Sequence, residues 1–113
     1  TLVQALGHTG RVKSPTYGLL EHYELATVNV LHLDLYRIGD PGELGFLGIE
    51  DLLDERTVLV VEWPEQGRAA LPVPDVEIRF TAGPDNSLDT RCLNFYAYSD
   101  SGVQLCRFID TLL

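Results

Sequence analysis

VNVLHLDLYR at residues 28–37 and TVLVVEWP at residues 57–64 are the two stretches that decide the fold of this chain. Each is an apolar run of strand length that reaches an acidic residue at its carboxyl end, Asp34 in the first and Glu62 in the second. Ligands of open α/β sheets bind in the crevice outside the carboxyl ends of the strands. Two carboxylates at two such ends are therefore the first candidates for chemistry.

The residues within these stretches predict how each strand is covered. Alternation gives the first strand one apolar and one polar face. The two faces are Leu31, Leu33 and Leu35 on one side and His32, Asp34 and Tyr36 on the other. The second stretch is apolar without a break from residue 58 to residue 61, which is typical of a strand covered on both faces.

The sequence around the first stretch predicts a helix end followed by a hairpin. Residues 1–6 are apolar enough for the last turns of a helix, and Gly7 is a typical stop. Residues 17–25 predict a strand, and only two residues separate it from the strand that starts at Val28. So short a connection allows only antiparallel pairing.

Two short helical pieces are predicted between the two stretches. Asp40 serves as N-cap, with Pro41 at N1 and Glu43 at N3, and two glycines then interrupt the apolar face. Because a helix precedes it, we expect the strand from residue 57 to pair parallel to the first. The sequence therefore predicts an α/β fold with a mixed sheet.

The C-terminal third predicts a second hairpin and a last helix, within a single domain that spans residues 1–113. Residues 75–82 and 88–98 alternate as two strands. Ser101 and Gln104 form a capping box for the helix that follows. Its predicted apolar face consists of Leu105, Cys106, Ile109, Leu112 and Leu113.

Composition narrows the class of protein. The chain has 45% hydrophobic and 22% charged residues, which is ordinary for a globular protein. Its net charge of -9 and single lysine argue against a broad nucleic-acid surface. It contains no apolar run of membrane-spanning length and no signal-peptide pattern. Two cysteines without metal-site spacing are typical of buried thiols in a cytosolic protein.

The acidic strand ends suggest specific chemistry. Asp34 has the place of the aspartate by which nucleotide hydrolases hold Mg²⁺, directly or through water, although a strand-end Asp also caps turns. Glu62 can orient a water or a metal ligand. Trp63 can stack on a base or cover the core. His32 is more typical of a satisfied, partly buried histidine than of a ligand.

A phosphate-binding loop is the necessary companion of such a site. GHTGRVKS at residues 7–14 comes within one residue of the P-loop pattern G-x-x-x-x-G-K-[ST]. Val12 stands in place of the second glycine, and Pro15 follows where a helix should begin. We therefore do not assign this segment as a P-loop.

Five segments in order carry a family resemblance: LGHTGRVKSPTYGLLEHY, HLDLYR, DPGELGFLGIEDLL, VVEWPEQG and LPVPDVEI. Together they resemble the TsaE (YjeE) family, small bacterial P-loop ATPases required for threonylcarbamoyladenosine (t6A) modification of tRNA. The resemblance implies a mixed-sheet, P-loop NTPase-like core that is truncated at its N-terminus. In the family a strand and the phosphate-binding loop precede the helix of which residues 1–6 would be the remainder.

The resemblance also implies ATP and Mg²⁺ as cofactors and assigns roles to residues. Asp34 resembles the Walker B aspartate, and Thr16 lies near the γ-phosphate or the metal. Glu62 is the catalytic candidate that positions the attacking water, and Trp63 lies beside the nucleotide. Without the phosphate-binding loop, we expect this chain alone to be inactive.

The family is described as cytosolic. Its members work bound to the threonylcarbamoyl transferase (TsaD-like) and its inactive paralogue (TsaB-like), so the resemblance implies that tRNA is contacted only through this complex. Tyr36 and Arg37 match the family motif and are assigned only support or partner contacts. Two alternatives stay open. One is a non-enzymatic module that docks on a partner, and the other is a metal-dependent hydrolase that uses His32, Asp34 and Glu62 directly.

Overall fold

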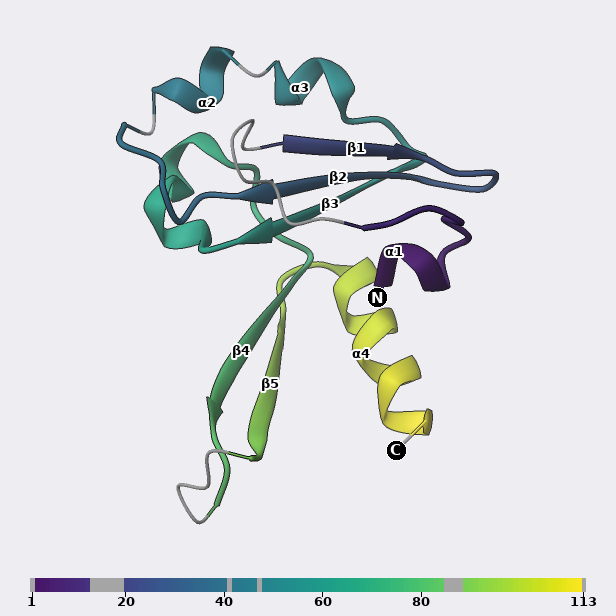
Figure 1. The fold of residues 1–113 in the computed structure, drawn as a ribbon. Coiled ribbons are helices and arrows are strands. Elements are labelled where there is room, and N and C mark those ends of the chain that lie inside the picture. The colour runs from purple at the N-terminus through teal and green to yellow at the C-terminus, as the bar shows by residue number, and fades with distance from the viewer. Residues whose placement is uncertain (1, 13–19, 41, 47, 85–88, 113) are drawn as a thin grey trace. The chain divides into compact units, whose positions relative to one another are not determined.

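The structure is a computed structural model that describes residues 2–12, 20–40, 42–46, 48–84 and 89–112. Contacts divide the chain into two compact units, Thr1–Leu71 and Pro72–Leu113, here called the N-terminal and C-terminal units. Each is described by itself, and the single-domain expectation stays a prediction. The N-terminal unit contains α1 (Leu2–Ala5), β1 (Leu20–Glu24), β2 (Asn29–Asp34), α2 (Glu43–Phe46), α3 (Ile49–Leu52), β3 (Thr57–Glu62) and the 3-10 turns η1 (Pro64–Gln66) and η2 (Arg68–Ala70) (Figure 1).

The N-terminal unit is built on a three-stranded mixed sheet in the order β1-β2-β3. β1 pairs antiparallel with β2, as the short connection predicts, and β2 pairs parallel with β3, as the intervening helices predict. In Figure 1 the arrowheads of β2 and β3 point the same way and that of β1 points the opposite way. The mixed α/β sheet is thus confirmed, whereas its placement in a P-loop core stays a prediction.

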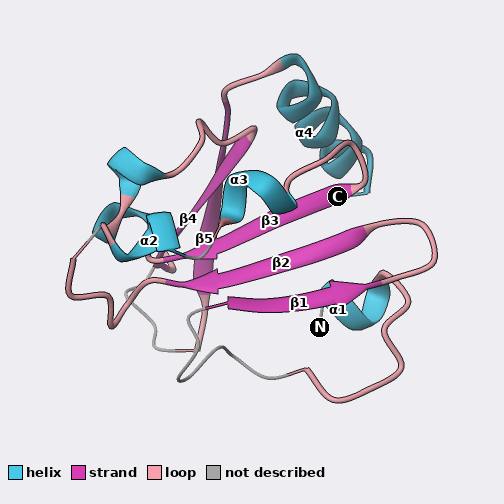
Figure 2. Ribbon diagram, turned by 90° about the horizontal axis from the view of Figure 1, so that it is seen from above, coloured by secondary structure: helices cyan, strands magenta, loops and turns pink. Residues whose placement is uncertain are grey.

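β2 is the central and most deeply buried strand (Figure 2). Val30, Leu31 and Leu33 have no exposed surface, because neighbouring strands pair with β2 on both sides. The expectation that residues 58–61 are covered on both faces is confirmed in part: Leu59 and Val61 pack against the buried cluster around Leu33, and Val60 packs against the one around Val30 on the other face. β3 lies at the edge of the described sheet, and the side chain of Val58 is 41% exposed.

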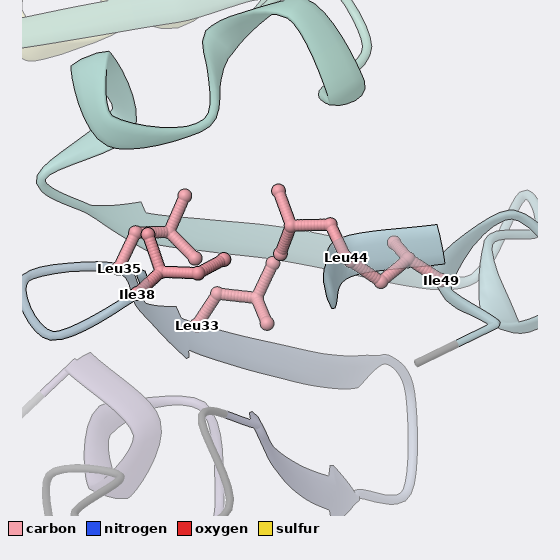
Figure 3. Packing of buried hydrophobic residues seen from close by; sticks show 5 residues of the cluster. All are labelled: Leu33, Leu35, Ile38, Leu44 and Ile49. Carbon is pink, nitrogen blue, oxygen red and sulfur yellow. The ribbon is translucent and has the colours of Figure 1, made fainter. Parts of the chain in front are cut away.

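The main core lies on the leucine face of β2, under α2 and α3. Leu33, Leu35, Ile38, Leu44 and Ile49 form one buried cluster (Figure 3). Burying each of these side chains contributes about 1.5–3 kcal/mol relative to leaving it exposed.

The two short helices above this core are confirmed as separate pieces. Asp40 Oδ1 accepts the backbone N–H of Gly42 at 2.9 Å, so the predicted cap residue does hold the start of the turn into α2. Pro41 lies outside the described residues. Gly48 has φ 64°, a conformation that glycine adopts without steric cost, and it separates α2 from α3.

The opposite face of the sheet carries a second, smaller cluster of Val3, Tyr23 and Val30. Val3 belongs to α1, which lies at this face while α2 and α3 lie over the other (Figure 1). α1 ends as predicted: Gly7 has φ 114° and its N–H donates to the Gln4 carbonyl at 3.0 Å. The sheet is therefore covered on both faces near the amino-terminal half of β2.

The C-terminal unit is a hairpin of β4 (Val76–Ala82) and β5 (Arg91–Ala97) followed by α4 (Asp100–Leu112). The hairpin is confirmed, but the predicted cap of the helix is wrong. α4 starts at Asp100, and its first turn is capped by Ser99, whose Oγ accepts the Gly102 N–H at 3.0 Å and donates to the Asp75 carboxylate. Ser99 is the residue directly before the helix, where a cap must lie, whereas Ser101 is already inside the helix.

The predicted apolar face of α4 is confirmed only in part. Cys106 and Ile109 are half-buried, whereas Leu105 and Leu112 are 50% and 69% exposed. A Cβ on Gly102 would meet the Asp75 carbonyl, so the helix lies close to the start of the hairpin at this glycine. Cys106 and Ile109, four and seven positions after Gly102, therefore lie on the helix face towards the hairpin. Leu113 lies outside the described residues.

The cysteines and the absence of a membrane-spanning run, both expected from the sequence, can be compared with the described part of the chain. Cys92 and Cys106 are free thiols and are half-buried rather than fully buried. Among the described residues, no helix is both long enough and apolar enough to cross a lipid bilayer.

Candidate functional site

The carboxyl ends of β2 and β3 lie side by side in the N-terminal unit. Asp34 and Glu62 are register partners of the parallel pair. The Leu35 N–H donates to the Glu62 carbonyl at 3.1 Å, so the two strands stay joined as far as their acidic residues. The structure thus brings together two carboxylates that are 28 positions apart in the sequence.

Asp34 is held by the turn that follows β2. Its Oδ1 accepts the backbone N–H of Tyr36 at 3.0 Å, and the residue is half-buried. This is the turn-capping role that the sequence left as an alternative. Because a carboxylate has two oxygens and about four acceptor positions, one such bond leaves capacity for a further donor or a cation. Turn capping and ligand binding are therefore compatible at Asp34.

Glu62 contacts a histidine on the neighbouring strand. His32 Nε2 lies 3.1 Å from Glu62 Oε2, and the side chains of the two residues are 14% and 49% exposed. The prediction that His32 is a partly buried, satisfied histidine is confirmed. The sequence alone did not show that its partner is the second acidic strand end, because this contact depends on the register of β2 and β3.

The backbone at Trp63 was not foreseen from the sequence. Trp63 has φ 56° and ψ 50°, the left-handed region, at a cost of about 1–2 kcal/mol for a residue that carries a Cβ. The proline that follows, Pro64, favours an extended conformation at Trp63, so the sequence carries no signal for the left-handed one. Strained residues of this kind cluster at ligand sites.

This backbone conformation turns the indole towards the loop after β2. The rings of Tyr36 and Trp63 have centroids 5.0 Å apart at an interplanar angle of 49°. Both side chains remain largely exposed, Tyr36 by 60% and Trp63 by 50%. Core cover, one of the two interpretations of Trp63, is therefore wrong, and an accessible aromatic pair lies beside the two carboxylates.

The remaining predicted residues are only partly placed. Thr16 lies outside the described residues, so its predicted position near phosphate or metal stays a prediction. Arg37 is exposed, next to Tyr36. Asp34, Glu62 and Trp63, by contrast, lie within one pair of strand ends and the turns that follow them.

The donor set at this edge suits a hard cation that keeps other ligands. Carboxylate oxygens are ligands that Mg²⁺ takes, and Mg²⁺ in nucleotide sites is bound by one or two carboxylates together with substrate phosphates and water. Within the ranges that the structure describes, no group of three His, Cys, Asp or Glu side chains is arranged to hold a metal ion. Two carboxylates at adjacent strand ends are donors of the kind that a Mg²⁺-phosphate site uses, and binding of a metal ion by Asp34 stays a prediction.

The fold and the site define a small α/β protein with acidic residues at the carboxyl ends of two adjacent parallel strands. Residues 1–91 match the family model described as threonylcarbamoyl adenosine biosynthesis protein TsaE. The chain belongs to the TsaE family.

Curated relatives agree with this assignment. The chain is 39% identical over 104 residues to the tRNA threonylcarbamoyladenosine biosynthesis protein TsaE of Haemophilus influenzae, covering 92% of the chain and 63% of the relative. The protein of the same name from Rickettsia bellii is 32% identical over 90 residues, covering 80% and 62%. That of Bacillus subtilis is 29% identical over 103 residues, covering 91% and 62%. The chain thus spans somewhat less than two thirds of the length of these relatives.

Proposed function

We propose that this chain contributes the acidic strand ends of an ATPase that acts in t6A modification of tRNA. The observation that carries the proposal is the in-register pair Asp34 and Glu62 at the carboxyl ends of two parallel strands. This is the edge at which open α/β sheets bind ligands. The family membership of the chain and the names of its relatives supply the pathway.

Asp34 and Thr16 are the residues that we assign to Mg²⁺. When bound, the ion neutralises charge on the β- and γ-phosphates of ATP. Asp34 is suited to this role because the Tyr36 N–H already fixes one of its oxygens, which orients the carboxylate before a ligand arrives.

Glu62 is assigned to the attacking water and Trp63 to the nucleotide base. A carboxylate within hydrogen-bond reach of a water can orient it and accept its proton. The half-exposed indole offers a flat surface to a base, and such stacking contributes about 1–3 kcal/mol. Phosphoryl transfer depends almost wholly on positioning and electrostatics, so these assignments require phosphate contacts from further residues.

In our proposal, ATP hydrolysis drives turnover of a complex with the threonylcarbamoyl transferase and its inactive paralogue. This complex works in the cytoplasm, and tRNA binds only through it. The acidic chain, with its net charge of -9, makes direct and extensive tRNA binding unfavourable. A partner-docking module without nucleotide is the alternative.

Calorimetric titration with Mg²⁺-ATP separates the two functions. It is run on the 113-residue chain and on a longer form if the reading frame continues upstream of Thr1. We expect Mg²⁺-dependent binding by a form that has the phosphate-binding loop, and a weaker magnesium-dependent part in Asp34→Ala. Asp51→Ala, which removes an exposed acidic residue of α3, is the matched control and should bind as the wild type does. Absence of binding in every form would favour the docking module.

A further inference from the structure

We propose that His32 is the positioning residue for Glu62: it holds the glutamate carboxylate in the orientation that lets it align the attacking water. The inference rests on the proposed function of Glu62. It starts from the contact of 3.1 Å between His32 Nε2 and Glu62 Oε2, a normal hydrogen-bond distance.

Strand register explains why these two side chains meet. His32 pairs with Val60 and Asp34 pairs with Glu62, so His32 and Glu62 lie on the same face of the sheet, diagonally across the two strands. Their backbones are fixed by the parallel ladder. Only side-chain rotation remains to be restricted, and the hydrogen bond restricts it.

Burial shows which partner orients the other. The His32 side chain is 14% exposed and lies in the middle of the sheet, whereas the Glu62 side chain is 49% exposed at its edge. A half-exposed glutamate samples several rotamers unless something holds it. The packed imidazole is therefore the fixed point, and the glutamate is the group that it positions.

The chemistry of the two groups assigns the proton. An ionised carboxylate only accepts hydrogen bonds, so Nε2 of His32 must carry the hydrogen in this contact. The bond to His32 uses Oε2, so within the part of the chain that the structure describes Oε1 can accept a hydrogen bond from a water. One oxygen is thus used for positioning while the other is available for the reaction.

The kinetic test compares two substitutions in the ATP-hydrolysing protein. His32→Leu removes the donor, and His32→Gln keeps an amide N–H with a similar reach. We expect His32→Leu to lower kcat for Mg²⁺-ATP by about 10- to 100-fold with KM within about twofold, and His32→Gln to recover most of kcat. His22→Leu, an exposed histidine of β1, should leave both constants unchanged.

A spectroscopic test reads the contact without nucleotide. In ¹⁵N-resolved NMR spectra of the imidazoles, Glu62→Ala should shift the His32 ring resonances, whereas Glu24→Ala in β1 should not. Unshifted resonances in Glu62→Ala overturn the proposal, even where a kinetic variant fails to fold.

The two proposals fail in different ways. If the wild type hydrolyses ATP but His32→Leu keeps its kcat, or changes only KM, His32 is not a positioning residue and the proposed function stands. If the wild type neither binds nor hydrolyses Mg²⁺-ATP, both proposals fall, although the shift of the His32 resonances would still show the contact.

Discussion

The rings of Tyr36 and Trp63 have centroids 5.0 Å apart, and the second of these residues holds the left-handed backbone conformation at φ 56°. The conformation is costly, and the side chain that it displays is half exposed rather than packed in the core. The cost therefore does not serve burial. It places an indole beside the acidic strand ends, where the proposed nucleotide base would stack.

Substitution of Trp63 by glycine and by alanine should show this strain. Both variants lose the ring, but only glycine adopts the left-handed region without a steric penalty. We expect Trp63→Gly to be more stable than Trp63→Ala by about 1 kcal/mol in urea unfolding, because relief of the left-handed strain outweighs the greater entropy of glycine in the unfolded chain. At an unstrained site alanine is the more stable of the two by about 0.4–1 kcal/mol. That opposite order would show that the backbone is not strained.

Gly67 tests how closely the loop after β3 packs on the main core. A Cβ there would lie 2.6 Å from Leu44 Cδ1 and 3.2 Å from Leu35 Cδ1, both of which belong to buried side chains. We expect Gly67→Ala to lower the free energy of unfolding by about 1–3 kcal/mol, because the core must repack.

Gly45→Ala is the matched control for this substitution. Gly45 lies in α2, and nothing stands within 4 Å of a Cβ built on it. Alanine should therefore raise the free energy of unfolding by about 0.4–1 kcal/mol. Equal effects of the two substitutions in urea unfolding would contradict the packing described for Gly67.

Asp54 should make stability depend on pH in the acidic range. Hydrogen bonds from the Thr57 hydroxyl and then from the Arg56 backbone N–H hold the pKa of Asp54 below its ordinary value of 3.8. A carboxyl whose pKa is depressed by folding stabilises the folded state above its unfolded pKa and loses that contribution as pH falls through the folded pKa. Stability from this turn should therefore decrease below about pH 4.

The measurement is the urea midpoint of the wild type and of Asp54→Asn at pH 7 and at successively lower pH. The wild type should have the higher midpoint at pH 7, and the difference should shrink as Asp54 is protonated. In a Thr57→Val background, which lacks the hydroxyl donor, the difference should be smaller throughout. A difference that does not change with pH would show that the charge of Asp54 contributes nothing.

Sequence patterns identified the elements of this fold because local patterns determine them. Alternation identified the buried face of β2, and the short connection before Val28 fixed the antiparallel pairing of β1 and β2. The edge position of β3 could not be read in the same way. An unbroken apolar run looks the same whether one strand or two pair with it.

The sequence predicted the acidic residues of the site but not the contacts that their neighbours make. Asp34 and Glu62 were recognisable because each ends an apolar strand. The hydrogen bond from His32 to Glu62 depends on strand register, which a sequence pattern does not fix on its own. The contact between the rings of Trp63 and Tyr36 joins residues 27 positions apart in the sequence. Such long-range constraints are what local propensity misses.

Fluorescence of Trp63 tests the central claim most directly, because it is the only tryptophan in the sequence and its emission reports on this edge of the sheet. Mg²⁺-ATP is titrated into whichever form of the protein is found by calorimetry to bind it. The account predicts a saturable change of emission with the calorimetric affinity, weakened in Asp34→Ala and retained in Asp51→Ala. Calorimetric binding with unchanged emission would place the nucleotide elsewhere and contradict the assignment of Asp34, Glu62 and Trp63 to one nucleotide site.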